Sequence, residues 1–182
     1  CDVVEKALDL LDQKAADRRE AWRGKRTDLY RRWYLNTKDA QDKQRIAVKL
    51  LTLRLEDAVS YETGGNWKEA TDAYTDAKSL GTFLKRENLN DISQKYARAR
   101  YLSGVQRKVE GYTKVLANSP GNTKVRLALL AALVVDMNDP QAAAKHLTDA
   151  VGQYWNAYVP QAGRPAAELE AAACKELGDW YY

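Results

Sequence analysis

Nucleophilic and metal-binding side chains are scarce in this chain of 182 residues. It has one histidine, His146, and two cysteines, Cys1 and Cys174. A zinc site made of histidine and cysteine would need almost this whole set at one place. A catalytic thiolate–imidazole pair would require Cys174 and His146 to meet in the folded chain. This pair is the catalytic Cys–His arrangement that we consider.

Both residues are better explained as parts of helices. Cys174 lies in the run AAACKEL, where a thiol acts as a small apolar packing group. We place it near the end of a predicted helix, where the helix dipole disfavours a thiolate. His146 precedes Leu147, a predicted core residue. The chain lacks the CxxC, HExxH, GxGxxG, GxxxxGK[ST] and GxSxG patterns, so we predict no catalytic, cofactor-binding or metal site and no enzymatic activity.

The composition favours a folded, helical chain. Hydrophobic residues make up 45% of the sequence and charged residues 30%, a balance typical of globular proteins. Ten glycines and four prolines supply too few turns for a protein of many short strands. There is no run of about 18 apolar residues, so we predict no membrane span. We therefore expect an all-α fold.

The spacing of apolar residues predicts helices joined by short turns. Apolar side chains recur every three or four residues, which is the period of one helix face. In the first predicted helix the apolar face includes Trp22, Leu29 and Trp33. We predict helices over residues 2–35, 39–62, 67–86, 91–117, 123–136, 140–157 and 165–177, with loops at 64–65, 118–122 and 159–165.

Successive helices with short connections pack as stacked antiparallel hairpins. We predict a long N-terminal hairpin over residues 1–63 and a helical-repeat region over residues 64–182. Together they would form one continuous array.

A repeat pattern is clearest at the start of the third predicted helix. The turn Gly65-Asn66-Trp67 is followed by Ala70, Tyr74 and Ala77, at spacings of three, four and three from Trp67. Small alanines let two helices approach closely, and the aromatic side chain fills the space between them. The pattern resembles the second half of a tetratricopeptide repeat, in which a Gly-Asp/Asn-aromatic turn precedes the same spacing.

Two weaker copies extend the resemblance. One covers residues 124–152, where Asp139-Pro140 replaces the turn, and the other starts at Gly178-Asp179-Trp180. The run from Tyr96 to Leu147, together with the terminal LGDWYY, also looks like helical-repeat segments of large multidomain planctomycete proteins. These resemblances imply a fragment of an α-solenoid that binds other proteins.

The tetratricopeptide resemblance also implies where a partner would bind. Stacked hairpins of this family form a concave groove that takes a peptide or a partner helix. Four positions in the first helix of the clearest repeat match the groove-lining positions of the family. They are Thr52, Leu55, Val59 and Glu62.

The charge distribution leaves other functions open. The net charge is +4, but residues 14–54 hold 13 Lys/Arg against 5 Asp/Glu, a net of +8. Such a basic hairpin, interleaved with aromatic residues, is an alternative site for nucleic acid or an anionic surface. Against it, Trp22, Leu29 and Trp33 are predicted to face the core. A third alternative is a non-catalytic part of a larger enzyme.

The two ends of the sequence add expectations about context. The first residue is Cys1, which suits a lipid-anchored extracytoplasmic protein whose mature chain begins at a modified cysteine. An internal fragment of a longer chain is the alternative. We favour the fragment, because a turn at Gly178-Asp179 would leave the last repeat without its second helix.

Overall fold

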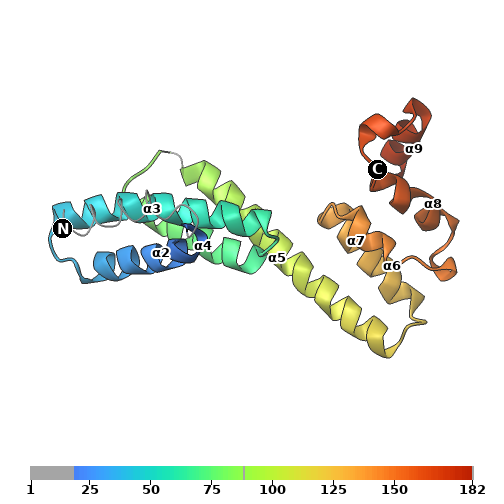
Figure 1. The fold of residues 1–182 in the computed structure, drawn as a ribbon, viewed down its shortest axis with the longest axis horizontal. Coiled ribbons are helices and arrows are strands. Elements are labelled where there is room, and N and C mark those ends of the chain that lie inside the picture. The colour runs from blue at the N-terminus through green and yellow to red at the C-terminus, as the bar shows by residue number, and fades with distance from the viewer. Residues whose placement is uncertain (1–18, 88, 182) are drawn as a thin grey trace. The chain divides into compact units, whose positions relative to one another are not determined.

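The computed structural model describes residues 19–87 and 89–181. Within these ranges it contains eight α-helices and no β-strand, so the predicted all-α fold is confirmed (Figure 1). The chain forms two compact units, Cys1–Arg100 and Tyr101–Tyr182, and the division between them lies inside one helix. No helix in the described ranges has the length and apolar character needed to cross a membrane.

The first unit is built from antiparallel helices that lie side by side (Figure 1). Asp39 begins the second of them, because its carboxylate accepts a hydrogen bond from the Asp42 backbone N–H at 2.8 Å. Gly65 adopts a φ of +70° in the next turn, a conformation that favours glycine. The helices are α2 (Arg19–Asn36), α3 (Ala40–Thr63), α4 (Trp67–Phe83) and the first part of α5 (Leu89–Asn118).

These bounds agree closely with the sequence-based prediction. Residues 2–18 of the first predicted helix lie outside the described ranges. The predicted boundary between residues 63 and 64 falls between α3 and α4, whereas these two helices share the core of the first unit.

The close contact of α3 and α4 depends on small residues around one ring. Ala58 of α3 and Ala70, Ala73 and Ala77 of α4 have no exposed surface. Tyr74 is also fully buried and fills the space that the alanines leave. The helices thus pack against each other in a way that is compatible with a helical repeat.

The buried side of α2 differs from the predicted one. Trp22 and Leu29 were expected in the core but are 37% and 41% exposed. Thr27 and Tyr30 are buried instead, at 4% and 3% exposure. The physical reason is a polar contact: the Thr27 hydroxyl donates a hydrogen bond to Asp57 of α3, which turns that side of α2 inward.

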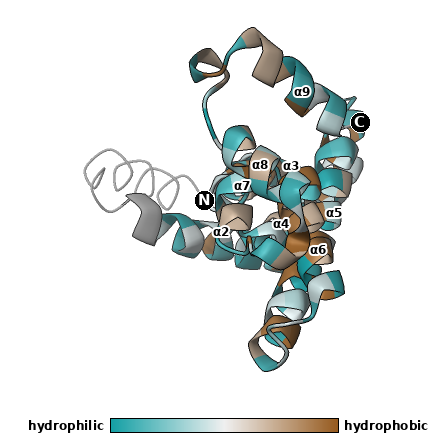
Figure 2. Cartoon of the chain, turned by 90° about the vertical axis from the view of Figure 1, so that its right-hand side faces the viewer, coloured by the Kyte–Doolittle hydropathy of each residue, from teal (hydrophilic) through white to brown (hydrophobic). Residues whose placement is uncertain are grey.

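The second unit has shorter and less regular helices. Its core is apolar, with Leu129, Leu130, Val134 and Val159 fully buried, and Figure 2 shows hydrophobic residues along α6. Besides the second part of α5, its elements are α6 (Thr123–Ala131), the π-helix η2 (Ala132–Asp136), α7 (Pro140–Ala144), the 3₁₀-helices η3 (Asp149–Val151) and η4 (Ala166–Glu168), α8 (Gln153–Ala162) and α9 (Ala171–Tyr181).

Two sequence predictions about this unit were wrong. The helix expected over residues 140–157 is interrupted, since α7 already ends at Ala144. The 3₁₀-helix η3 follows, and Gly152, with a φ of +89°, separates η3 from α8. Part of the expected loop at 159–165 is helical, since α8 continues to Ala162 with Pro160 inside it.

The prediction of a turn at Gly178-Asp179 was also wrong, because both residues lie inside α9. Leu177 is buried, and Trp180 packs edge-on against Trp155 of α8, with ring centroids 5.3 Å apart. This spacing of three residues places both side chains on one helix face. The apolar contact with α8 therefore favours a continued helix over a turn.

Candidate interaction surface

The four predicted groove residues share one side of α3, although Leu55 also packs against the core of the first unit. Thr52 and Val59 are exposed, Val59 by 50%, whereas Leu55 and Glu62 are half-buried. Val48, 37% exposed, lies one turn before Thr52. At about 100° per residue, these positions fall within an arc of about 80°. We call Val48, Thr52, Leu55, Val59 and Glu62 the α3 face.

The opposite side and one flank of α3 hold the helix in place. Its buried positions pack against the core that α3 shares with α2 and α4. From Val48 to Val59 the α3 face is about 16 Å long, at about 1.5 Å per residue. A rigid helix therefore presents two exposed valines, a half-buried leucine and a threonine on one side.

One end of the α3 face is tied to the core. The Tyr74 hydroxyl donates a hydrogen bond to Glu62 at 3.0 Å. Burial of Tyr74 raises its pKa to about 12, and the hydrogen bond to the Glu62 carboxylate adds to the shift. Glu62 is thus a structural partner of the α3–α4 contact as well as a member of the face.

The other end of the face borders a hollow. A depression of about 500 Å³ is lined by Gln44, Val48, Leu84 and the charged residues 85–87. Phe83, just before it at the end of α4, is 46% exposed. The Val48 end of the face therefore combines exposed apolar side chains with charged neighbours.

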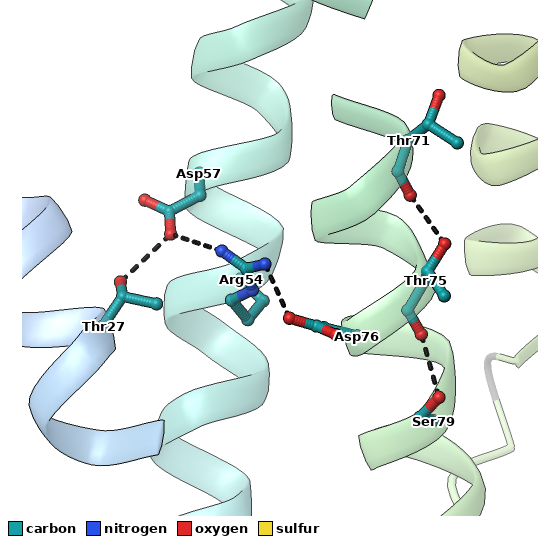
Figure 3. A network of polar contacts seen from close by, with 7 residues as sticks. All are labelled: Thr27, Arg54, Asp57, Thr71, Thr75, Asp76 and Ser79. Atoms are coloured by element: carbon teal, nitrogen blue, oxygen red, sulfur yellow. Dashed lines mark hydrogen bonds and ion pairs between the residues drawn. The ribbon is translucent and has the colours of Figure 1, made fainter. Parts of the chain in front are cut away.

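A network of charged residues connects the three helices of the first unit. Arg54 of α3 lies between two carboxylates, as Figure 3 shows, with distances of 2.6 Å to Asp76 of α4 and 3.5 Å to Asp57. Asp57 is 3% exposed, and it also pairs with Arg23 of α2 at 3.0 Å. Two cations and two anions are thereby balanced.

This network specifies how the helices align. A buried carboxylate is costly unless cations and hydrogen bonds satisfy it. Asp57 has both, since Arg23 and Arg54 pair with it and Thr27 donates a hydrogen bond at 3.0 Å. Sliding α2 along α3 by one turn would separate these groups, so we assign the network a role in helix register.

This network was not predicted from the sequence, although the sequence contains one indication of it. Arg54 and Asp57 are three residues apart in a helix that is apolar on several sides. Charged residues at such positions are rarely buried unless they are paired. Their partners on α2 and α4 could not be found, because they lie 22 or more residues away in sequence.

A second exposed surface lies on α2. Trp22, Lys25, Leu29 and Arg32 are exposed and share one side of the helix. The Lys25 ammonium lies 5.2 Å from the centroid of the Trp22 ring. We call these four residues the α2 face. Trp22 and Leu29 are exposed here, whereas the sequence-based prediction placed both in the core.

The two residues considered for catalysis lie in different elements of the second unit. His146 follows α7, and its pKa is lowered by partial burial and by the charges of Arg126 and Lys145. Cys174 is exposed in the first turn of α9, so the expectation that it lies near the end of its helix was wrong. Within the described ranges, no three residues of His, Cys, Asp or Glu are grouped to hold a metal ion.

No protein-family model, curated protein or solved structure matches the chain.

Proposed function

We propose that this chain is a non-catalytic helical module that binds a peptide or a partner helix through the α3 face. The observation that supports this function is the exposure of Val48 and Val59 on a helix held rigid by its opposite side. A fixed helix loses little conformational entropy on binding, and exposed valines offer apolar surface to a partner. Thr52 between them supplies a hydroxyl, whose hydrogen bond to the Val48 carbonyl orients it at 3.3 Å.

Site-specific photocrosslinking of the full chain tests this function. A photoreactive amino acid at Val59 should capture a protein partner, whereas the same group at Val135, 59% exposed in the second unit, should not. With the purified partner, Val59→Asp should weaken binding about tenfold, as for a hot-spot residue at an interface. Equal affinities for Val59→Asp and the control Val135→Asp would contradict the proposal.

A second candidate is binding of nucleic acid, favoured by the α2 face. Exposed Trp22 and Leu29 beside Lys25 and Arg32 give stacking surface and positive charge together. Binding of a single-stranded oligonucleotide should fall steeply between low and moderate salt. It should also weaken in Lys25→Glu but not in Lys124→Glu, an exposed control. Absence of binding at low salt would exclude this candidate.

A further inference from the structure

A small cavity lies between the three helices of the first unit. Its volume is about 190 Å³. Leu50 and Leu80 are buried at 4% and 5% exposure, while Leu35 is 68% exposed, so the cavity has an apolar floor and opens to solvent. Its lining residues are Arg31, Tyr34 and Leu35 of α2, Leu50 of α3, and Asp76, Ser79 and Leu80 of α4.

The volume limits what the cavity can hold. Pockets for drug-sized ligands measure about 300–1,000 Å³, which is well above this one. An apolar cavity of about 150 Å³ holds a benzene molecule. The cavity therefore has room for one aromatic ring or one branched aliphatic side chain.

The polar groups around the opening give it a positive charge. Asp76 is paired with Arg54 at 2.6 Å, so its charge is compensated. The Ser79 hydroxyl already donates a hydrogen bond to the Thr75 carbonyl at 3.0 Å (Figure 3). Arg31 is exposed and has no ion-pair partner among the described residues. Its guanidinium is therefore available to a carboxylate outside the chain.

We propose that this cavity binds a phenylalanine or leucine side chain of a partner peptide in which acidic residues flank that side chain. The apolar anchor would contact Leu50 and Leu80, and the neighbouring carboxylate would pair with Arg31. Both this cavity and the α3 face are proposed to bind a protein partner. The cavity is a different surface, because Leu50 belongs to the buried side of α3.

Peptide titrations followed by NMR test the proposal on the full chain. The probes are three short peptides: a phenylalanine between two glutamates, the same peptide with lysines, and the glutamate peptide with alanine as its centre. At millimolar concentration, the first should shift the methyl signals of Leu50 and Leu80. The lysine peptide should bind about two- to fivefold more weakly, as expected for one exposed ion pair, and the alanine peptide should cause no shift.

Matched variants complete the test. Arg31→Glu should remove the preference for glutamates, whereas Lys49→Glu, at an exposed position of α3 outside the cavity, should keep it. Ser79→Phe, which fills the opening from an exposed position of α4, should abolish the methyl shifts. Equal binding of the glutamate and lysine peptides, or unchanged binding in Ser79→Phe, would overturn the proposal. Neither result depends on Val48 or Val59, so the α3 face is tested separately.

Discussion

The two units reach a packed core by different means. In the first, long helices approach through fully buried alanines, and a network of two cations and two anions crosses from α2 to α4. In the second, short helices surround leucines and valines, and a π-helix and two 3₁₀-helices interrupt the regular structure. Its ion pair Arg164–Glu168 is exposed, at 4.0 Å.

This difference concerns specificity as much as stability. Apolar side chains of similar volume can replace one another with small cost, so an apolar core tolerates several arrangements. A buried carboxylate that needs two arginines and a threonine as partners allows few arrangements of the helices around it. We therefore expect the first unit to be the more sensitive to single polar changes, and the second to respond mainly to lost volume.

The largest expected effect is the loss of stability when a buried aromatic ring is removed from the first unit. Tyr74→Ala should lower the free energy of unfolding by about 3–5 kcal/mol, because the ring is fully buried between α3 and α4. Tyr154→Ala, 64% exposed in the second unit, is the matched control and should cost less than about 1 kcal/mol. Urea denaturation measures both. Similar losses would show that the α3–α4 contact is not tightly packed.

Removing the central carboxylate should have the next largest effect. Asp57→Ala should lower the free energy of unfolding by about 3 kcal/mol. This is the lower end of the range for a broken buried ion pair, because Arg23 is partly solvated. Glu168→Gln in the second unit should change the free energy of unfolding by less than about 1 kcal/mol. Thermal and urea unfolding would compare them. If Asp57→Ala cost no more stability than Glu168→Gln, the two units would not differ in their sensitivity to polar changes.

Overpacking the alanine contact should cost less. Ala70→Leu adds volume where α3 and α4 meet and should destabilise by about 1–3 kcal/mol. Ala157→Leu, on an exposed position of α8, should be nearly neutral. Melting temperatures of the two variants give the comparison, and equal values would argue against close helix contact.

The burial of Tyr74, together with its hydrogen bond to Glu62, should make the first unit sensitive to alkali. The pKa of Tyr74 is about 12 in the folded chain, against about 10 unfolded, so the unfolded state loses its proton first. The stabilisation is complete below pH 10 and is lost as the pH rises toward 12. Tyr74→Phe lacks the hydroxyl, so at pH 7 it should lose about 0.5–1.5 kcal/mol of stability, and this loss should shrink progressively as the pH rises above 10. Unfolding of both proteins from pH 8 to 11 measures the difference.

The smallest expected effect concerns acid in the second unit. The lowered pKa of His146 means that the unfolded state takes up a proton first as the pH falls. The stability associated with neutral His146 is therefore present above about pH 6.5 and declines below it. In His146→Gln this decline should be reduced, and melting temperatures between pH 7.5 and 5 would show it. If the melting temperatures of the parent and His146→Gln fell in parallel with pH, the partly buried environment assigned to the imidazole would be contradicted.

In the first unit, sequence patterns predicted the buried residues well where these recur every three or four positions along a helix. Ala70, Tyr74 and Ala77 were expected at the α3–α4 contact, and all three are fully buried. The prediction failed on α2, where Thr27 faces inward because a distant aspartate attracts it. Apolar spacing carries no information about such a partner.

The second unit was harder to predict for a related reason. Gly152 ends one helical segment through its own conformation, yet Gly178 lies within α9. The two glycines differ in context, because Trp180 finds aromatic partners on α8 that lie far away in sequence. Four of the five residues of the α3 face followed from the repeat resemblance, whereas Val48, the α2 face and the cavity required the structure.

The balanced network of the first unit also restricts how this chain can change during evolution. Losing one of Arg23, Arg54, Asp57 or Asp76 leaves an unpaired charge in or beside the core, while replacing a whole pair by apolar residues can be neutral. Single substitutions at these positions therefore pass through a less stable intermediate. In related sequences the four positions should vary together, so that a charged set and an apolar set both occur but mixtures are rare.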